Sequence, residues 1–219
     1  MPSISVSNLD LYRMWRDSEE LDLEWLLRRL RGEEPQTEAM KAGLALHEAL
    51  EHAEPQYAAK LISGEYKFYF RCEGELAMPQ FGELSFEKDY GPLTVRGRVD
   101  WLKGRTVKDY KTTASFDADR YLEGYQWRYY LDMTDADTFE WIVFVMDELR
   151  GTHKEYEIFQ IHELRQHRYE GLYEDCVKLA GEFLEFARGL EANGTDWRRA
   201  AVFSSPVAGL GPERAEIPV

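Results

Sequence analysis

Cysteine and long apolar runs are both scarce in this sequence. Its two cysteines, Cys72 and Cys176, lie far apart in unrelated contexts. Because a disulfide framework needs an even and regular set of cysteines, we expect both thiols to be free and buried. No run of about 18 apolar residues is present to span a membrane, and the opening MPSISVSNLD lacks the basic and apolar regions of a secretory signal. These absences predict a protein of the reducing cytoplasm.

Positive charge is also in short supply. The chain has 27 Lys and Arg residues against 41 Asp and Glu residues, which gives a net charge of −14. A protein that coats nucleic acid passively should be basic, so this balance argues against that class. It leaves open an enzyme that binds cations among carboxylates and grips phosphate through one local patch.

Two segments depart from the acidic average. Residues 93–111, LTVRGRVDWLKGRTVKDYK, hold six basic residues against two acidic ones: Arg96, Arg98, Lys103, Arg105, Lys108 and Lys111. The stretch LLRRLRG holds Arg28, Arg29 and Arg31. Both segments are candidate phosphate-binding patches, although an ordinary solvated face explains the second equally well.

The length of 219 residues fits one α/β or α+β domain with a terminal extension. Apolar periodicity and capping residues predict helices over 9–32, 37–53, 116–133 and 164–190. Alternation predicts strands over 65–72, 83–88, 138–148 and 153–163, and a hairpin over 93–112 that turns near Lys103 and Gly104. The order α-α-β-β-β-β-α-β-β-α predicts a central mixed β-sheet flanked by helices.

The hairpin VRGRVDWLKGRTVKDYKTT carries more charge than a plain hairpin needs. Because side chains alternate along strands, Asp100, Asp109 and Lys111 should share one face. A loop over 103–106 would place the two aspartates directly opposite each other, and a two-residue turn at 103–104 would leave them diagonal. A divalent cation would relieve the repulsion between the two carboxylates. An ion pair of Asp100 with Lys111, or with a nearby arginine, is the alternative.

Two residue pairs on flanking helices add to this pattern. In GLALHEALE, His47 and Glu51 are four residues apart and share a helix face, and so are Gln126 and Tyr130 in QWRYY. A zinc-protease motif is excluded at the first pair, because it requires a histidine where the chain has Glu51. Either pair alone is also typical of an ordinary packed or solvated helix face.

Taken in order, these pieces resemble the PD-(D/E)XK nuclease superfamily and, within it, the RecB-like exonuclease group. The similarity covers roughly residues 3–147 and includes the opening SISVSNLDLYRMW. It rests on a helical histidine (His47), an aspartate in GRVD (Asp100), the D-x-K motif (Asp109, Tyr110, Lys111) and the Q-x-x-x-Y motif (Gln126, Tyr130). Many relatives carry a cysteine after the opening tyrosine and three more near the C-terminus. Here the first place reads YRMWRD and only Cys176 lies late in the chain, so we expect no iron–sulfur cluster.

The resemblance implies a restriction-endonuclease-like core and a DNA exonuclease that depends on one or two Mg²⁺ or Mn²⁺ ions. Residues 1–190 would form a single nuclease domain, with a helical part over 1–36, the catalytic core over 37–147 and the last strand and long helix over 148–190. Residues 191–219, which hold three of the eight prolines, would form an irregular tail.

The resemblance also implies a role for each motif residue. Asp100, Asp109, His47 and the carbonyl of Tyr110 would bind metal, and the histidine would favour Mn²⁺. Lys111 would orient or deprotonate the attacking water and stabilise charge on the phosphate. Gln126 and Tyr130 would position the lysine, the water or the DNA backbone. The candidate phosphate contacts are Arg28, Arg29, Arg96, Arg98 and Arg105.

Other functions stay open at this point. An endonuclease of the same superfamily would use the same residues, and a non-catalytic nucleic-acid or protein-binding module could retain the scaffold. A bland acidic interaction protein is a third alternative. By analogy with phage exonucleases, some of which form rings around DNA, we expect DNA as the partner, a homo-oligomer, and a separate helicase or recombination protein. A phage enzyme would act in the host cytoplasm.

Overall fold

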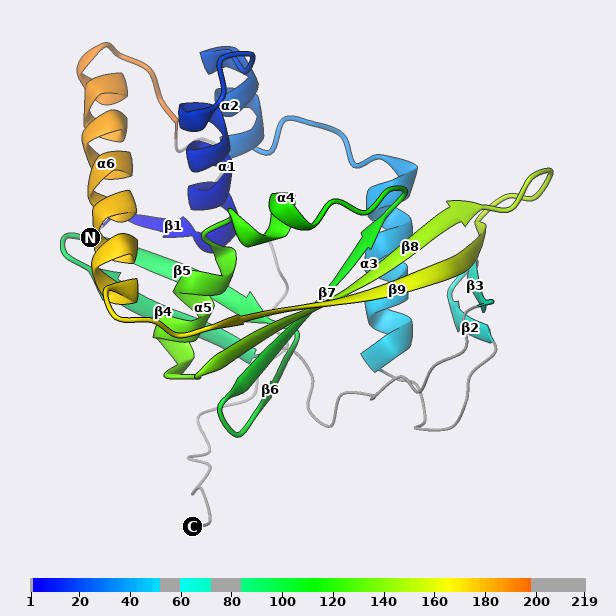
Figure 1. Cartoon of the computed structure of the whole chain (residues 1–219). Coiled ribbons are helices and arrows are strands. Elements are labelled where there is room, and N and C mark those ends of the chain that lie inside the picture. Colours follow the sequence, from blue (N-terminus) through cyan, green and yellow to red (C-terminus); the bar gives the residue numbers. More distant parts are fainter. Residues whose placement is uncertain (1, 52–59, 72–83, 198–219) are drawn as a thin grey trace, which may run out of the picture.

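The computed structural model describes residues 2–51, 60–71 and 84–197 of the chain, and these residues form a mixed α/β fold (Figure 1). A six-stranded sheet has the order β2 (Lys60–Ser63), β3 (Tyr66–Phe70), β9 (Glu155–His167), β8 (Thr138–Glu148), β7 (Thr106–Thr113) and β6 (Trp101–Lys103). A three-stranded sheet has the order β1 (Ser3–Ser5), β5 (Leu93–Val99) and β4 (Leu84–Tyr90). The helices are α1 (Val6–Asp17), α2 (Leu23–Leu30), α3 (Glu38–Glu51), α4 (Ala118–Leu122), α5 (Gln126–Thr134) and α6 (Leu172–Ala192).

Strand β8 lies inside the larger sheet and explains why that sheet is mixed. It pairs parallel with β7 and antiparallel with β9, and β3 runs parallel to β9. Its sequence WIVFV is apolar at consecutive positions because both of its faces are buried. The predicted fold class, a mixed sheet flanked by helices, is therefore confirmed.

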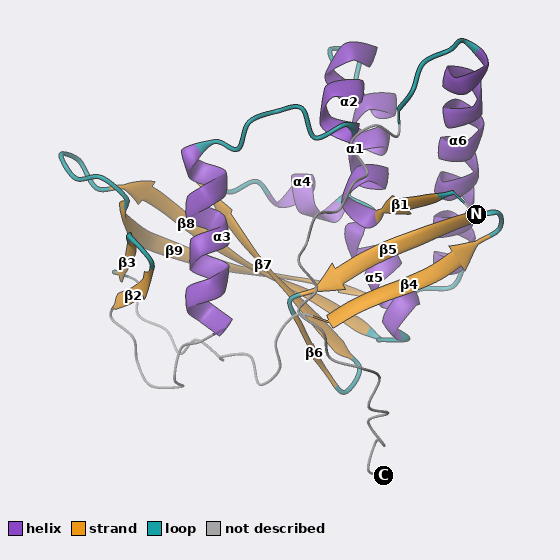
Figure 2. Ribbon diagram, turned by 180° about the vertical axis from the view of Figure 1, so that it is seen from behind, coloured by secondary structure: helices purple, strands orange, loops and turns teal. Residues whose placement is uncertain are grey.

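Helices cover both faces of the larger sheet. Figure 2 shows α3 in front of β8 and β9, with α4 and α5 on the far side. Under α3, Leu46 and Leu50 pack with Phe144 in one buried cluster. On the other face, a larger cluster joins β7 and β8 to α1, α5, α6 and the three-stranded sheet.

Two of the predicted helices are broken by polar residues that bond to nearby backbone. The helix predicted over 9–32 is α1 and α2, because Ser18 accepts hydrogen bonds from the N–H groups of Glu20 and Leu21 and Asp22 caps α2. The helix predicted over 116–133 is α4 and α5. Its break is stabilised by Asp10 of α1, which accepts a hydrogen bond from the N–H of Tyr125 at 2.8 Å.

The C-terminal prediction also needs correction. The helix predicted over 164–190 begins only at Leu172, because β9 continues to His167 and pairs there with the start of β8. The element order also gains β1 and β2, which the sequence did not predict. Cys176 is free and buried, as expected. Cys72, most of the predicted tail and the last residues of the helix predicted over 37–53 lie outside the described residues. Within the described ranges, no helix is long and apolar enough to cross a membrane.

Candidate active site

The predicted hairpin over 93–112 is two separate pairings that divide at Asp100. Leu93–Val99 pairs with β4 in the smaller sheet, through a tight turn at Gly91, where φ is 64°. Trp101–Lys103 pairs with β7 in the larger sheet, with Lys103 opposite Thr106. The turn therefore falls at 104–105 and not at 103–104. Asp100 lies at the bend where the chain passes from one sheet to the other, and not within a strand.

Where the pairing of β7 with β6 ends, the carboxylate of Asp100 takes the place of a strand partner for β7. Pairing between β6 and β7 ends with Trp101 opposite Lys108. Asp100 Oδ2 accepts a hydrogen bond from the N–H of Tyr110 at 2.8 Å, in place of a strand partner. In a strand, the N–H and C=O of one residue point to the same side. The carbonyl of Tyr110 therefore faces the same gap as Asp100.

His47 reaches this gap from α3. Its Nδ1 lies 3.6 Å from Asp100 Oδ2, and its ring meets the ring of Tyr110 edge-on, with centroids 6.2 Å apart. One turn earlier, a Cβ on Gly43 would lie only 2.8 Å from Thr112 Oγ1 of β7. The glycine thus permits the close approach of α3 to β7 that brings His47 to Asp100.

Asp109 and Lys111 project from the opposite face of β7. Asp109 is 2% exposed, and its Oδ2 lies 2.5 Å from Lys111 Nζ in an ion pair. Gln126 Nε2 of α5 donates to Asp109 Oδ1 at 3.2 Å. The ammonium group of Lys111 is the contact of Asp109 Oδ2, and this oxygen has no further partner among the described residues. The ion pair that Lys111 forms is therefore with Asp109, and not with Asp100 as in the alternative interpretation of the sequence.

Burial shifts the pKa values of both residues of this pair. Burial raises the pKa of Asp109 to about 6, the charge of Lys111 opposes that rise, and the charge of Asp100 adds to it. Burial alone would lower the pKa of Lys111, but the charges of Asp109 and Asp100 raise it. The side chain of Lys111 as a whole is 32% exposed, while its ammonium group lies against the buried carboxylate of Asp109.

The raised pKa of Asp109 predicts a stability effect that depends on pH. Below about pH 4 the carboxyl is protonated in both the folded and the unfolded chain, and its titration costs no stability. Between about pH 4 and 6 the unfolded chain loses the proton first, so the penalty grows, and above about pH 6 it is complete. In a chelating buffer, Asp109→Asn should therefore gain on the order of 2–3 kcal/mol relative to wild type between pH 4 and pH 7.5.

Urea unfolding at the two pH values measures this gain. Comparing pH values rather than absolute stabilities isolates the titration of Asp109 from other effects of the substitution. Asp147→Asn, which alters an exposed carboxylate on β8, serves as the control and should show no such gain. An equal stability difference for Asp109→Asn at both pH values would contradict the prediction.

Tyr130 closes the site from α5, four residues after Gln126. Its ring packs on Gly97 of β5, where a Cβ would overlap Tyr130 Cε1, and stacks on Phe139 with centroids 6.1 Å apart. Burial and the charge of Asp109 raise the pKa of Tyr130, while Gln126 opposes the rise. Gln126 thus bonds to Asp109, and Tyr130 is buried beside it.

The predicted phosphate contacts are placed less uniformly. Arg96 and Arg98 lie exposed on β5, directly before Asp100, and Arg96 pairs with Glu87 at 2.8 Å. Arg105 lies at the β6–β7 turn, paired with Asp135 and Asp137. Arg28 and Arg29 are exposed on α2, and Arg29 pairs with Glu34 at 3.0 Å. The arginines nearest to Asp100 in sequence are Arg96 and Arg98, and their role in DNA binding stays a prediction.

The contact made by Asp10 was not predicted from the sequence. It accepts the N–H of Tyr125 from a position 115 residues away and so fixes the start of α5, on which Gln126 lies. A Cβ on Gly124 would come 3.2 Å from Asp10 Oδ2, so this glycine gives the carboxylate room. No local pattern in SNLDLY indicates such a contact.

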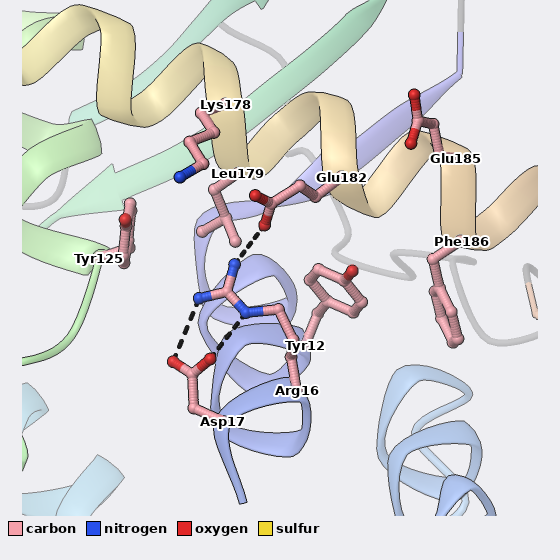
Figure 3. A pocket seen from close by; sticks show the side chains of 9 residues that line it. All are labelled: Tyr12, Arg16, Asp17, Tyr125, Lys178, Leu179, Glu182, Glu185 and Phe186. Carbon is pink, nitrogen blue, oxygen red and sulfur yellow. Dashed lines mark hydrogen bonds and ion pairs between the residues drawn. The ribbon is translucent and has the colours of Figure 1, made fainter.

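A pocket of about 480 Å³ lies apart from this site, between α1, α6 and Tyr125 (Figure 3). It contains none of the residues predicted to be catalytic. At its centre Arg16 bridges Asp17 and Glu182, so the protein already neutralises this guanidinium group.

Comparisons with known proteins bear on the fold. No family model and no curated protein matches this chain. The crystal structure of the protein SSO0001 has a TM-score of 0.50 at 17% identity, covering 85% of this chain and 77% of that one. An alkaline exonuclease from Laribacter hongkongensis has a TM-score of 0.47 at 15% identity, covering 88% and 91%. Its complex with dAMP gives 0.41 at 15% identity, covering 87% and 94%. At these identities a likeness shows shared fold alone, and function has to be argued from the site.

Proposed function

We propose that this chain is a divalent-metal-dependent deoxyribonuclease that hydrolyses phosphodiester bonds of DNA as an exonuclease. The observation that carries the proposal is the buried carboxylate of Asp109. It is paired with Lys111, held by Gln126 and influenced by the charges of Asp100 and His47. Two carboxylates and a lysine, at the point where the chain passes from one sheet to the other, form a site suited to a cation and a phosphate.

The donor atoms fit Mg²⁺ or Mn²⁺. Asp109 Oδ2 is buried with the ammonium group of Lys111 as its contact, and Asp100, which also acts on Asp109 through its charge, lies against the backbone of Tyr110. Across 2–51, 60–71 and 84–197, no three His, Cys, Asp or Glu side chains form a ready metal cluster. Mg²⁺ does not require one, since it binds through one or two carboxylates together with waters and substrate phosphates. His47 would add the imidazole that suits Mn²⁺.

The mechanism follows from what the side chains can do. A bound ion would supply positive charge for the phosphate and acidify the attacking water. Lys111, whose pKa is raised, stays protonated near neutral pH and so stabilises negative charge on the phosphate, and does not act as a base. Asp109 fixes the position of this ammonium group, and Gln126 fixes Asp109. Tyr130, whose pKa is also raised, keeps its hydroxyl proton and can donate it in a hydrogen bond.

The test is degradation of labelled DNA. Linear duplex labelled at either end, single-stranded DNA and closed circular DNA are incubated with Mg²⁺, with Mn²⁺ or with a chelator. We expect both ions to support degradation of linear DNA and the chelator to stop it. Cleavage of closed circles would identify an endonuclease. Binding of DNA without hydrolysis under all conditions would contradict the proposed function and favour a non-catalytic binding module.

His47→Ala should raise the concentration of Mn²⁺ needed for half-maximal activity roughly tenfold or more, because the variant removes a ligand or the partner that orients Asp100. Metal titrations of the DNA-degradation rate measure this. The matched control is His153→Ala, in which an exposed histidine paired with Glu148 at the β8–β9 turn is removed. An unchanged metal requirement in His47→Ala would remove His47 from the metal site.

A further inference from the structure

Three aromatic rings form a cluster beside Asp109 and Lys111 that the proposed mechanism does not use. The rings of Phe116 and His162 are stacked with centroids 3.8 Å apart and an angle of 5° between their planes. The ring of Tyr121 is stacked on Phe116 at 6.1 Å and 20°. Phe116 comes from the loop that follows β7, Tyr121 from α4 and His162 from β9.

The strand register places this cluster on the catalytic face. Lys111 of β7 is opposite Val143 of β8, which is in turn opposite His162 of β9. Residues opposite each other project from the same face of a sheet, so His162 lies on the face of Lys111, two strand spacings or about 10 Å away. Burial raises the pKa of Tyr121, and the charges of Lys111 and Asp109 also act on it. The cluster and the site therefore adjoin.

The cluster differs from the aromatic packing beneath it. Phe139 and Trp141 of the same face are buried, at 0% and 1% exposure. Phe116, Tyr121 and His162 all stay partly exposed. Among the described strands, β3 pairs with β9 only as far as Ile158, so no neighbouring strand covers His162 on that side. Phe116 and Tyr121 thus pack against the core, and His162 lies at the outer end of the stack, on the face of the sheet that carries Lys111.

We propose that the outer face of the His162 ring, held flat by the stacked ring of Phe116 and by Tyr121 behind it, binds a nucleobase of the substrate by stacking. This inference rests on the proposed function and specifies its substrate. Aromatic side chains stack on any base, because every base has a flat π face. A base inside a duplex has both faces covered by its neighbours, so the cluster takes a base that is unpaired. The site therefore acts on nucleic acid that is single-stranded near the cleaved bond, as a single strand or a frayed end.

Binding in a chelating buffer tests the inference without requiring hydrolysis. The probes are a fluorescent single-stranded oligonucleotide and the same oligonucleotide with abasic terminal residues. Wild type should bind the intact oligonucleotide about 5- to 150-fold more tightly than the abasic one, which is the range expected for stacking of one base. Phe116→Leu, which keeps the apolar volume but not the flat ring, should lose this preference. Phe116→Tyr should keep it.

Phe186→Leu is the control for a general loss of aromatic packing, because Phe186 packs against Tyr12 and Trp15 in the helical layer. It should bind both oligonucleotides as wild type does. Equal binding of the two probes by wild type, or an undiminished preference in Phe116→Leu, would overturn the inference. Absence of hydrolysis with a retained base preference would contradict only the proposed nuclease function.

Discussion

Lys111→Ala should lower the rate of metal-dependent DNA hydrolysis by about 10²–10³-fold while leaving the fold intact, and Asp109→Asn should lower it at least as much. Lys111 provides a fixed positive charge beside the gap, and loss of one such stabilising group typically lowers rates by 10²–10³-fold. Asp109→Asn removes a proposed metal ligand as well as the partner of Lys111, so we expect a loss on the order of 10³-fold or more. Initial rates on labelled linear DNA with Mn²⁺ measure both.

Circular dichroism and thermal melting establish that the variants fold. Lys41→Ala provides the matched control, because Lys41 also forms a lysine–carboxylate pair, with Glu38 at 2.6 Å, but on the exposed side of α3. Its rate should equal that of wild type. If a folded Lys111→Ala variant also hydrolysed DNA at the wild-type rate, the assignment of the catalytic site would be wrong.

The parts of this site that could be predicted are those whose residues lie close together in the sequence. Asp109 and Lys111 alternate along one strand, and Gln126 and Tyr130 follow one helix face, so local periodicity places each pair together. Structure then brings the two pairs into contact through Gln126 and Asp109. The catalytic roles of these residues are still predictions.

The position of Asp100 could not be derived in the same way. Residues 93–103 alternate well enough to form one long strand, and the prediction made them the first strand of a single hairpin over 93–112. The actual outcome depends on β4, which offers Leu93–Val99 seven paired positions across a tight turn. The alternation of apolar and polar residues shows that a segment forms a strand, but it does not show which of two possible strands becomes its partner. The bend at Asp100 is the result of that choice.

The contact between His47 and Asp100 depends on tertiary structure in a second way. The helical period places His47 on the same face as Gly43, but only the packing of Gly43 against Thr112 directs that face to β7. Similarly, the breaks at Ser18 and at Tyr125 arise where polar side chains satisfy backbone groups that a continuous helix would have used. The periodicity of apolar residues contains no information about such hydrogen bonds.

Gly97→Ala should destabilise the protein by about 3 kcal/mol and remove most of its activity. Gly97 lies within the regular strand β5, so alanine suits the backbone there. The new methyl group would overlap Tyr130 Cε1, and it would lie 3.1 Å from Tyr130 Cδ1 and from Val6 Cγ2. The ring of Tyr130 cannot move away cheaply, because it is 4% exposed and stacked on Phe139. Displacing it would disturb α5, which carries Gln126.

Urea unfolding and DNA-degradation rates measure this effect. A second glycine serves as the control for the general effect of replacing glycine with alanine. A Cβ on Gly181, inside α6, would meet nothing within 4 Å, so Gly181→Ala should stabilise the protein by about 0.5–1 kcal/mol. In a Tyr130→Leu background the ring carbon that the methyl meets is gone, and Gly97→Ala should then cost less than about 1 kcal/mol. An equal cost in both backgrounds would mean that Gly97 is required for the strand itself, and not for seating Tyr130 beside Asp109.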